Sequence, residues 1–127
     1  MPVKARKRTR TRTDSGFAVE SAAAAWLQRR GLICRERNFR CRGGEIDLIM
    51  HAGQTLVFVE VRLRNRSDFG SAAESVTVTK QQRVIRAAQL YLAIHGIDRA
   101  CRFDVLAARQ EGDDIIWEWV QDAFRAG

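Results

Sequence analysis

Acidic residues lie inside two segments of this chain that otherwise have the pattern of buried β-strands. The first segment covers residues 44–47 and the second covers residues 59–62. Burying a carboxylate without a partner is costly, so a strand that carries one needs a cation, a proton or a hydrogen-bond network beside it. One economical explanation is a divalent-metal site, and this possibility constrains the fold more than any other feature of the sequence.

The two segments alternate in the way expected for the strands of a hairpin. Residues 45–50 place Asp47 opposite the main apolar face, and residues 55–62 place Glu60 opposite the valines. A turn centred on residues 52 and 53 makes Asp47 and Glu60 diagonal neighbours on one face, roughly 7–8 Å apart at the backbone. Two carboxylates at this spacing can lean together and share one ion.

Arg62 lies two residues after Glu60 on the same predicted face. With Asp47, these residues approach the pattern Asp…Glu-x-Lys of metal-dependent nucleases. Hard oxygen ligands suit Mg²⁺, and the ion can lower the pKa of a bound water and stabilise charge on a phosphate. A salt bridge of Arg62 with Glu60, or of another arginine with Asp47, explains the pattern equally well, because short acidic patterns are common.

Two further charged residues are candidates for the same site. Glu20 borders the apolar stripe of a predicted helix, about 100° from Val19, and could reach the end of a sheet packed beneath it. Lys80 lies four residues before Val84 on the buried face of a second helix, in the first turn, where a cation opposes the helix dipole. This position favours a role with phosphate or with a water proton. The alternatives are a solvated flank for Glu20 and snorkelling to solvent for Lys80.

The net charge of +7 is unevenly distributed along the 127 residues. Residues 1–13 contain six basic residues and no acid, and the rest of the chain holds 16 basic and 15 acidic residues. Basic clusters favour phosphate backbones through counterion release, although a solvated, disordered tail is the simpler reading. The basic residues expected to contact nucleic acid are Lys4, Arg6, Lys7, Arg8, Arg10, Arg12, Arg40, Arg42, Arg83 and Arg86.

Composition argues against several classes of protein. No apolar run approaches the roughly 20 residues of a membrane span, and no apolar stretch follows the basic N-terminus as in a secretory signal. The three cysteines lack metal-ligand spacing and indicate reduced thiols. We therefore expect a cytoplasmic protein that does not enter a membrane.

Hydrophobic periodicity predicts a single α/β domain over residues 15–127, after a basic tail at residues 1–14. A first helix is expected over residues 15–30. A second is expected from Thr79, where Gln82 completes a capping-box signature, to about residue 95. Strands are expected at about 32–40, 45–50, 55–62, 101–108 and 115–119. This order, with nearly all-apolar central strands, predicts a layered α/β sandwich.

Several short motifs also occur in the order found in a known family. They are Gly16 with Glu20, Gly31, Asn38-Phe39-Arg40, Gly44-Glu45-Ile46-Asp47-Leu48-Ile49, Phe58-Val59-Glu60-Val61-Arg62, Phe69-Gly70, Lys80 and Arg102-Phe103-Asp104-Val105. Over about residues 16–108 the chain thereby resembles the YraN-type family of small bacterial proteins. That family is similar to the restriction-endonuclease-like superfamily and, within it, to the Holliday-junction resolvases. The resemblance implies a three-layer α/β/α sandwich around a mixed sheet, metal ligation by Asp47 and Glu60, support from Glu20, and a nucleic-acid substrate.

One position departs from the superfamily pattern, because Arg62 stands where a catalytic lysine is usual. Arginine stays charged and transfers protons poorly, although it can stabilise a charged transition state. Either Arg62 acts electrostatically, or Lys80 takes the lysine's role, or the site is catalytically weak.

We expect a Mg²⁺- or Mn²⁺-dependent endonuclease that acts on DNA. Its catalytic residues would be Glu20, Asp47, Glu60, Arg62 and Lys80. A non-catalytic nucleic-acid-binding adaptor and a protein–protein scaffold are the alternatives, and the sequence leaves a homodimer open.

Overall fold

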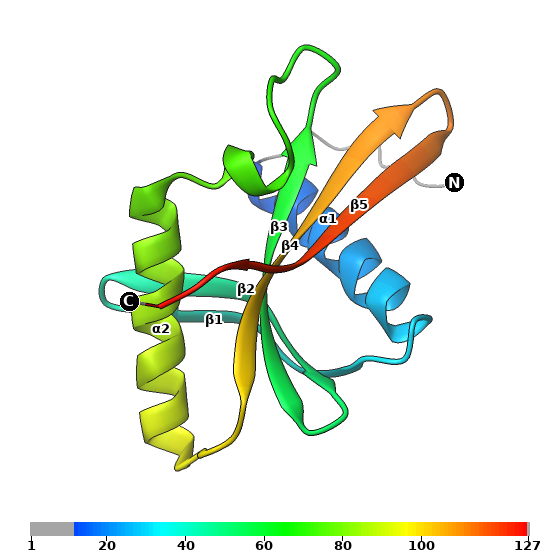
Figure 1. The fold of residues 1–127 in the computed structure, drawn as a ribbon. Helices are drawn as coiled ribbons and strands as arrows, with labels where there is room; N and C mark the ends of the chain where they lie inside the picture. The colour runs from blue at the N-terminus through cyan, green and yellow to red at the C-terminus, as the bar shows by residue number, and fades with distance from the viewer. Residues whose placement is uncertain (1–11, 127) are drawn as a thin grey trace.

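The computed structural model describes residues 12–126 (Figure 1). Its elements, in chain order, are α1 (Arg12–Gln28), β1 (Ile33–Cys41), β2 (Gly44–Ala52), β3 (Thr55–Arg64), the short 3-10 helix η2 (Ala73–Ser75), α2 (Val78–His95), β4 (Cys101–Glu111) and β5 (Asp114–Phe124). The first helix begins at Arg12, three residues earlier than predicted. The remainder of the predicted basic tail, residues 1–11, lies outside the described residues.

The five strands form one mixed sheet in the order β1-β2-β3-β4-β5. Neighbouring strands are antiparallel except for β3 and β4, which are parallel. Parallel strands cannot be joined by a tight turn, and the connection from β3 to β4 therefore contains η2 and α2. The predicted α/β class and single domain are confirmed.

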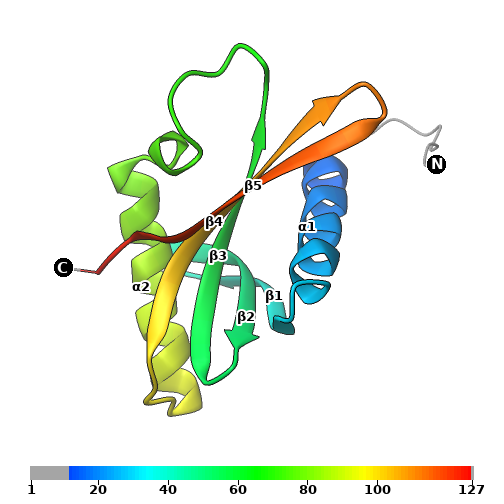
Figure 2. The same cartoon turned by 45° about the vertical axis from the view of Figure 1, so that its right-hand side comes forward.

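The two helices cover opposite faces of the sheet (Figure 2). Alternate side chains of β3 point to each helix: Val57 and Val59 belong to the core beneath α1, and Leu56 and Phe58 belong to the core beneath α2. A strand buried on both faces reads as a nearly continuous apolar run, as the sequence of β3 does. The layering of helix, sheet and helix agrees with the predicted sandwich.

Three tryptophans hold α1 against the far end of the sheet. Trp26 of α1 stacks on Trp117 of β5, with 5.7 Å between the ring centroids, and meets Trp119 edge-on at 6.0 Å. Trp117 and Trp119 alternate on β5, and both therefore face α1. These contacts fix the helix that carries Glu20.

The sheet forks between β2 and β3. These strands pair from Ala52↔Thr55 to Leu48↔Val59, and beyond that point β2 pairs only with β1 and β3 only with β4. The predicted register was wrong by two residues, because the turn lies at Gly53 and Gln54 rather than at residues 52 and 53. Gly53 has a φ of +61°, which a tight hairpin turn requires and which glycine adopts without strain.

The regular alternation predicted for β2 is also broken at the fork. Ile46 packs in the core beneath α2, whereas Leu48 packs beneath α1. The prediction that Asp47 lies opposite one main apolar face is therefore wrong, because β2 has no single apolar face at this point. Asp47 lies where β2 leaves its partner and the strand direction is no longer fixed by a ladder on both sides.

The buried stripe of α2 is formed by Val84, Ala87, Ala88 and Tyr91. The predicted N-cap was wrong, because Thr77 rather than Thr79 caps the helix. The Thr77 hydroxyl accepts a hydrogen bond from the backbone N–H of Lys80 at 3.1 Å. Thr77 has the extended backbone of a cap residue, which places Thr79 and Lys80 inside the first helical turn.

The last two strands are longer than predicted. β4 ends at Glu111 and β5 begins at Asp114, and the two continue as a paired hairpin beyond the helices (Figure 1). Polar residues at the end of β4 obscured this extension in the sequence, because the hairpin is solvated there.

Candidate functional site

Asp47 occupies the fork and replaces the missing strand partner of β3. Its carboxylate oxygen Oδ2 accepts a hydrogen bond from the backbone N–H of Val61 at 2.9 Å. A buried strand N–H needs an acceptor, and the side chain supplies one where the β2 backbone has moved away. This explains why an acid lies inside an apolar strand, and the same carboxylate faces the side chains of Glu20 and Glu60.

Glu60 is the first residue of β3 beyond the last pair with β2, Leu48↔Val59, and it is almost completely buried. The residue is 3% exposed, and its Oε1 has no hydrogen-bond partner among the residues that the structure describes. Burial, with the nearby charge of Asp47, raises the pKa of Glu60 to about 8, and Lys80 and Arg62 counteract this only in part. Glu60 is therefore a carboxylate with too little local compensation for its charge.

Glu20 reaches the same place from α1. It is half-buried, and in the described part of the chain its Oε1 also lacks a hydrogen-bond partner. Burial, then the charge of Asp47, raises the pKa of Glu20 to about 7, while Asn38 and Arg40 on β1 lower it. Glu20 and Glu60 thus come from different elements and meet at Asp47, as the predicted site requires.

Lys80 enters from the first turn of α2. Its Nζ lies 3.1 Å from Oε2 of Glu45 and 3.8 Å from Oε2 of Glu60. The hydrogen bond from Lys80 holds the pKa of Glu45 below its ordinary value. Lys80 therefore neither snorkels away nor packs in the core, and its ammonium group lies between two strands at the site.

Glu45 was not among the predicted site residues. It stands two positions before Asp47 on β2, and that spacing was the available signal for it. Its contact with α2 depends on Gly44, where a Cβ atom would lie 2.1 Å from the carbonyl oxygen of Arg83. The absence of a side chain at Gly44 lets the start of β2 lie directly against α2.

Arg62 follows Glu60 on β3 and is half-buried. Its Nε is buried without a hydrogen-bond partner, and within the described residues it forms no ion pair with Asp47 or Glu60. The simple salt bridge considered as an alternative is therefore not the arrangement found. Arg62 instead contributes positive charge near Glu60 without being fixed by it.

Four of the predicted nucleic-acid-binding arginines lie on elements next to this cluster. Arg40 acts electrostatically on Glu20 and Glu45, and Arg83 acts on Glu45. Arg86 lies against the β1–β2 turn, where its side chain is 3.1 Å from the position of a Cβ on Gly43. These residues and Arg42 are exposed. For the rest of that group, α1 contains Arg12, and residues 4, 6, 7, 8 and 10 lie outside the described residues.

A second buried acid shows what a structurally satisfied carboxylate looks like in this protein. Asp104 on β4 is 0% exposed, and its oxygens accept hydrogen bonds from Arg102, from Trp119 Nε1 at 2.9 Å and from the backbone N–H of Asp122 at 2.9 Å. Neither Glu20 nor Glu60 has such a set of donors. The burial of Asp104 is explained by the fold, whereas the burial of Glu20 and Glu60 is not.

The donor set at the fork is made of oxygen atoms, which suits a hard divalent ion. Asp47 and Glu60 could hold such an ion, with Glu20 near enough to orient a water or a second ion. As the side chains stand in the described part of the chain, no group of three or more His, Cys, Asp or Glu residues is arranged to hold a metal. Binding would therefore require the carboxylates to adjust.

Comparison with known proteins places this site within a family. Residues 19–108 match the model described as Uncharacterised protein family UPF0102. The chain belongs to the UPF0102 family. The matched region includes the whole cluster at the fork, from Glu20 to Lys80, and coincides with most of the region on which the resemblance to small bacterial proteins rests.

Curated relatives are similar over most of their length. A UPF0102 protein of Aeromonas hydrophila subsp. hydrophila is 54% identical over 114 residues, which cover 87% of this chain and 85% of the relative. One of Cupriavidus metallidurans is 53% identical over 118 residues, covering 91% and 84%. One of Janthinobacterium sp. is 49% identical over 112 residues, covering 88% of each chain. In the described part of this chain, no helix is long and apolar enough to cross a membrane.

Proposed function

We propose that this protein is a metal-dependent endonuclease of the restriction-endonuclease-like superfamily that hydrolyses phosphodiester bonds of DNA in the cytoplasm. The observation that carries the proposal is the carboxylate of Glu60, which is buried at the fork of β2 and β3 with Asp47 beside it and with no partner for Oε1 among residues 12–126. Such a group is unfavourable in a protein that has no use for it.

The residues present fit a hard divalent cation. Among the described residues, Glu20 and Glu60 each have one buried oxygen without a donor, and both have a raised pKa because they are buried and because Asp47 lies near them. A cation between Asp47 and Glu60 would satisfy these oxygens and remove the repulsion, and Glu20 would orient water or a second ion. When bound, Mg²⁺ or Mn²⁺ would supply an activated water and stabilise charge on the phosphate.

The cationic side chains at the fork are suited to the substrate. Glu45 holds Lys80 so that its ammonium group faces Glu60, where it can bind a phosphate oxygen or exchange a proton with water. Arg62 presents a guanidinium group that is suited to phosphate geometry. These different positions of Lys80 and Arg62 support the hypothesis that Lys80 has taken the role of the lysine that is usual at position 62 in the superfamily.

A cleavage assay tests the proposal. The full-length protein is incubated with linear duplex, branched and single-stranded DNA in Mg²⁺, in Mn²⁺ and in EDTA. We expect divalent-dependent cleavage of at least one substrate, and loss of cleavage in Glu60→Gln. The control is Asp113→Asn, which removes an exposed acid in the turn between β4 and β5 and should leave cleavage unchanged.

The substitution of arginine for lysine at position 62 favours one alternative, a binding adaptor that kept the nuclease fold. Binding of DNA without cleavage under any metal would support the adaptor and overturn the enzyme. A protein that neither binds nor cleaves nucleic acid, and whose Glu60→Gln variant behaves as the wild type in every assay, would instead be the scaffold.

A further inference from the structure

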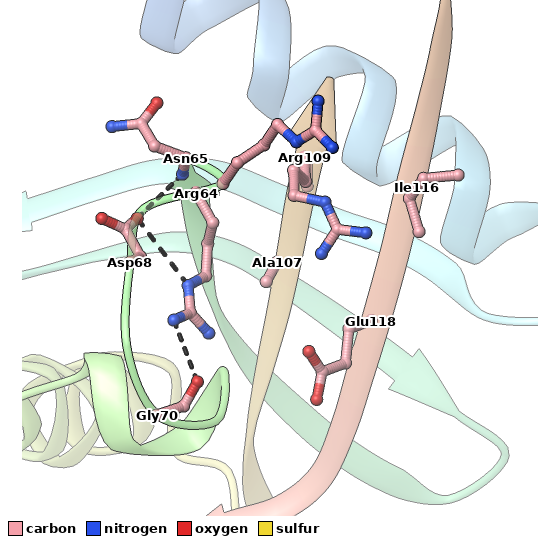
Figure 3. A pocket seen from close by; sticks show the side chains of 10 residues that line it. Arg64, Asn65, Asp68, Gly70, Ala107, Arg109, Ile116 and Glu118 are labelled. Atoms are coloured by element: carbon pink, nitrogen blue, oxygen red, sulfur yellow. Dashed lines mark hydrogen bonds and ion pairs between the residues drawn. The ribbon is translucent and has the colours of Figure 1, made fainter. Parts of the chain in front are cut away.

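A hollow of about 180 Å³ opens on the same side of the sheet as Glu60 (Figure 3). Its floor includes Ala107 of β4, which is paired with Arg62 of β3. Because Glu60, Arg62 and Arg64 alternate along β3 toward α2, the hollow continues along the strand from the carboxylate cluster. Arg64, four residues beyond Glu60, lies about 13 Å along the strand from it.

The charges around the hollow are mixed. Arg64 stabilises the neighbouring loop, because it donates hydrogen bonds to the backbone carbonyls of Phe69 and Gly70 at 3.0 and 3.1 Å. Arg66 is exposed and can turn toward a ligand at the rim. The side chain of Arg109 is about 42% exposed and pairs with Glu111 at 2.7 Å, so it would have to exchange this ion pair for a contact with the ligand.

A carboxylate faces the interior of the hollow. Figure 3 shows Glu118 of β5 pointing into it, below the arginines. Its negative charge disfavours a phosphate at this depth. A carboxylate in such a position accepts hydrogen bonds, for example from the exocyclic amine of cytosine. The hollow therefore has basic side chains at its rim, and Glu118 suits a ligand group that donates a hydrogen bond.

Phe69 lies in the loop that walls the hollow, and it is 94% exposed. The backbone on both sides of it is fixed: the N–H of Asn65 donates to Asp68 at 2.8 Å, Arg64 donates to the carbonyl of Phe69, and the N–H of Ser71 donates to Glu74 at 2.8 Å. The ring is thus held in solvent by an ordered loop. An exposed aromatic ring of this kind can stack on a nucleic-acid base, and because Phe69 does not line the hollow it would do so outside the rim.

The volume of the hollow excludes a complete small-molecule ligand. Such pockets usually measure about 300–1,000 Å³, whereas this one has about 180 Å³. It can accept one group of a larger ligand whose remainder lies elsewhere on the protein. The carboxylate cluster on the same face indicates where that remainder would lie.

We propose that the hollow and Phe69 form a subsite for one unpaired nucleotide of the nucleic acid that is cleaved at the fork. Its base stacks on Phe69 and donates to Glu118, and its neighbouring phosphates contact Arg66 and Arg109. This inference rests on the proposed function. The 13 Å separation exceeds the roughly 3.4 Å step between adjacent nucleotides along a duplex, so the nucleotide in the subsite is not the one at the scissile bond.

The test compares two labelled DNA duplexes that differ only by one unpaired cytosine. Binding to the full-length protein is measured by fluorescence anisotropy at fixed salt in EDTA, so that no cleavage occurs. We expect the wild type to prefer the bulged duplex. Phe69→Ala should weaken binding of the bulged duplex by roughly 5- to 150-fold, the range found for loss of one base–aromatic stack, and should hardly change binding of the paired duplex.

Two controls make the result specific. Ile94→Ala removes another exposed apolar side chain, 61% exposed on α2, and should leave both affinities unchanged. Glu118→Ala should reduce the preference for an unpaired cytosine over an unpaired thymine. Because Phe69 and Glu118 are exposed, neither substitution should alter the fold, which circular dichroism checks.

The outcomes separate this inference from the function on which it rests. Wild-type protein that cleaves DNA, with Phe69→Ala equally weakened on both duplexes or on neither, would overturn the subsite and leave the nuclease proposal standing. Wild-type protein that binds neither duplex in EDTA would overturn the subsite alone, because the nuclease proposal is tested separately by cleavage of linear, branched and single-stranded DNA in Mg²⁺ or Mn²⁺. Polyglutamate serves as the probe for an acidic peptide in the subsite. If it does not displace the bulged duplex from the wild type, an acidic peptide is excluded as the occupant. If polyglutamate binds and its binding requires Arg109, while binding of DNA does not require Arg109, the occupant is a peptide and the inference is wrong.

Discussion

Replacing Glu60 by glutamine should stabilise the metal-free protein at neutral pH. The pKa of Glu60 is raised from 4.5 to about 8 by burial and by the charge of Asp47. Between these values the folded state keeps a proton that the unfolded state releases, so the stabilising effect of the protonated carboxyl is complete below about pH 4.5 and is lost as the pH rises toward 8. At pH 7, about 2.5 pH units above the ordinary value, the difference amounts to at most about 3 kcal/mol.

The assay is urea unfolding in EDTA at pH 5, 7 and 8.5. The free energy of unfolding of the wild type should fall across this range. Glu60→Gln should lose most of the fall, with a residual slope from Glu20, whose pKa is about 7. With a denaturant slope of about 1–3 kcal/mol/M, a gain of about 3 kcal/mol moves the urea midpoint at pH 7 by about 1–3 M. The exposed carboxylate of Glu118 provides the control, and Glu118→Gln should keep the wild-type pH dependence.

Divalent ions extend the same experiment. Mg²⁺ or Mn²⁺ bound only by the folded state should stabilise the wild type at pH 7, and Glu60→Gln should lose this response. A wild-type stability that is flat from pH 5 to 8.5, or an equal slope in Glu60→Gln, would refute the reasoning that Glu60 is buried with its charge uncompensated.

Three further results are expected. Asp47→Asn keeps an acceptor for the backbone of β3 but removes the charge, so calorimetry should show loss of Mn²⁺ binding with the fold intact; unchanged affinity would contradict the metal site. Lys80→Ala should lower cleavage far more than DNA binding, while Arg62→Lys should be tolerated or raise activity; the reverse pattern in kinetic assays would make Arg62 the essential group. Gly44→Ala should destabilise the protein by about 1–3 kcal/mol or more in urea unfolding, since its Cβ would lie 2.1 Å from the carbonyl oxygen of Arg83; a wild-type midpoint would show that β2 and α2 can separate there at little cost.

The parts of the fold that follow from local patterns could be predicted from the sequence. The stripe of α2 obeys the helical period, and the alternation of β3 obeys the strand period, because each depends on neighbours within one element. The meeting of Glu20 with Asp47 could be anticipated for the same reason, since the edge of the apolar stripe of α1 must lie over the sheet.

Features that depend on contacts between elements could not be predicted in this way. The register at the fork depends on the carboxylate of Asp47 replacing a backbone acceptor for Val61, and an alternation pattern contains no information about such a substitution. The role of Glu45 depends on the approach of α2 at Gly44, which is set by tertiary packing. The choice of Thr77 over Thr79 as the helix cap likewise depends on the path of the preceding loop.

The hydrogen bond between Val61 and Asp47 gives the protein a reporter that needs no added probe. Val59, two residues earlier, is paired with Leu48 on one side and Asp104 on the other, so its amide should exchange with solvent only when the sheet opens widely. The amide of Val61 is protected by a single side chain. In a ¹⁵N-labelled sample, its exchange rate relative to that of Val59 would therefore follow the movement of Asp47 itself. Slower exchange of the Val61 amide on addition of diamagnetic Mg²⁺ would contradict the idea that the Asp47 carboxylate turns away from the backbone to hold the ion.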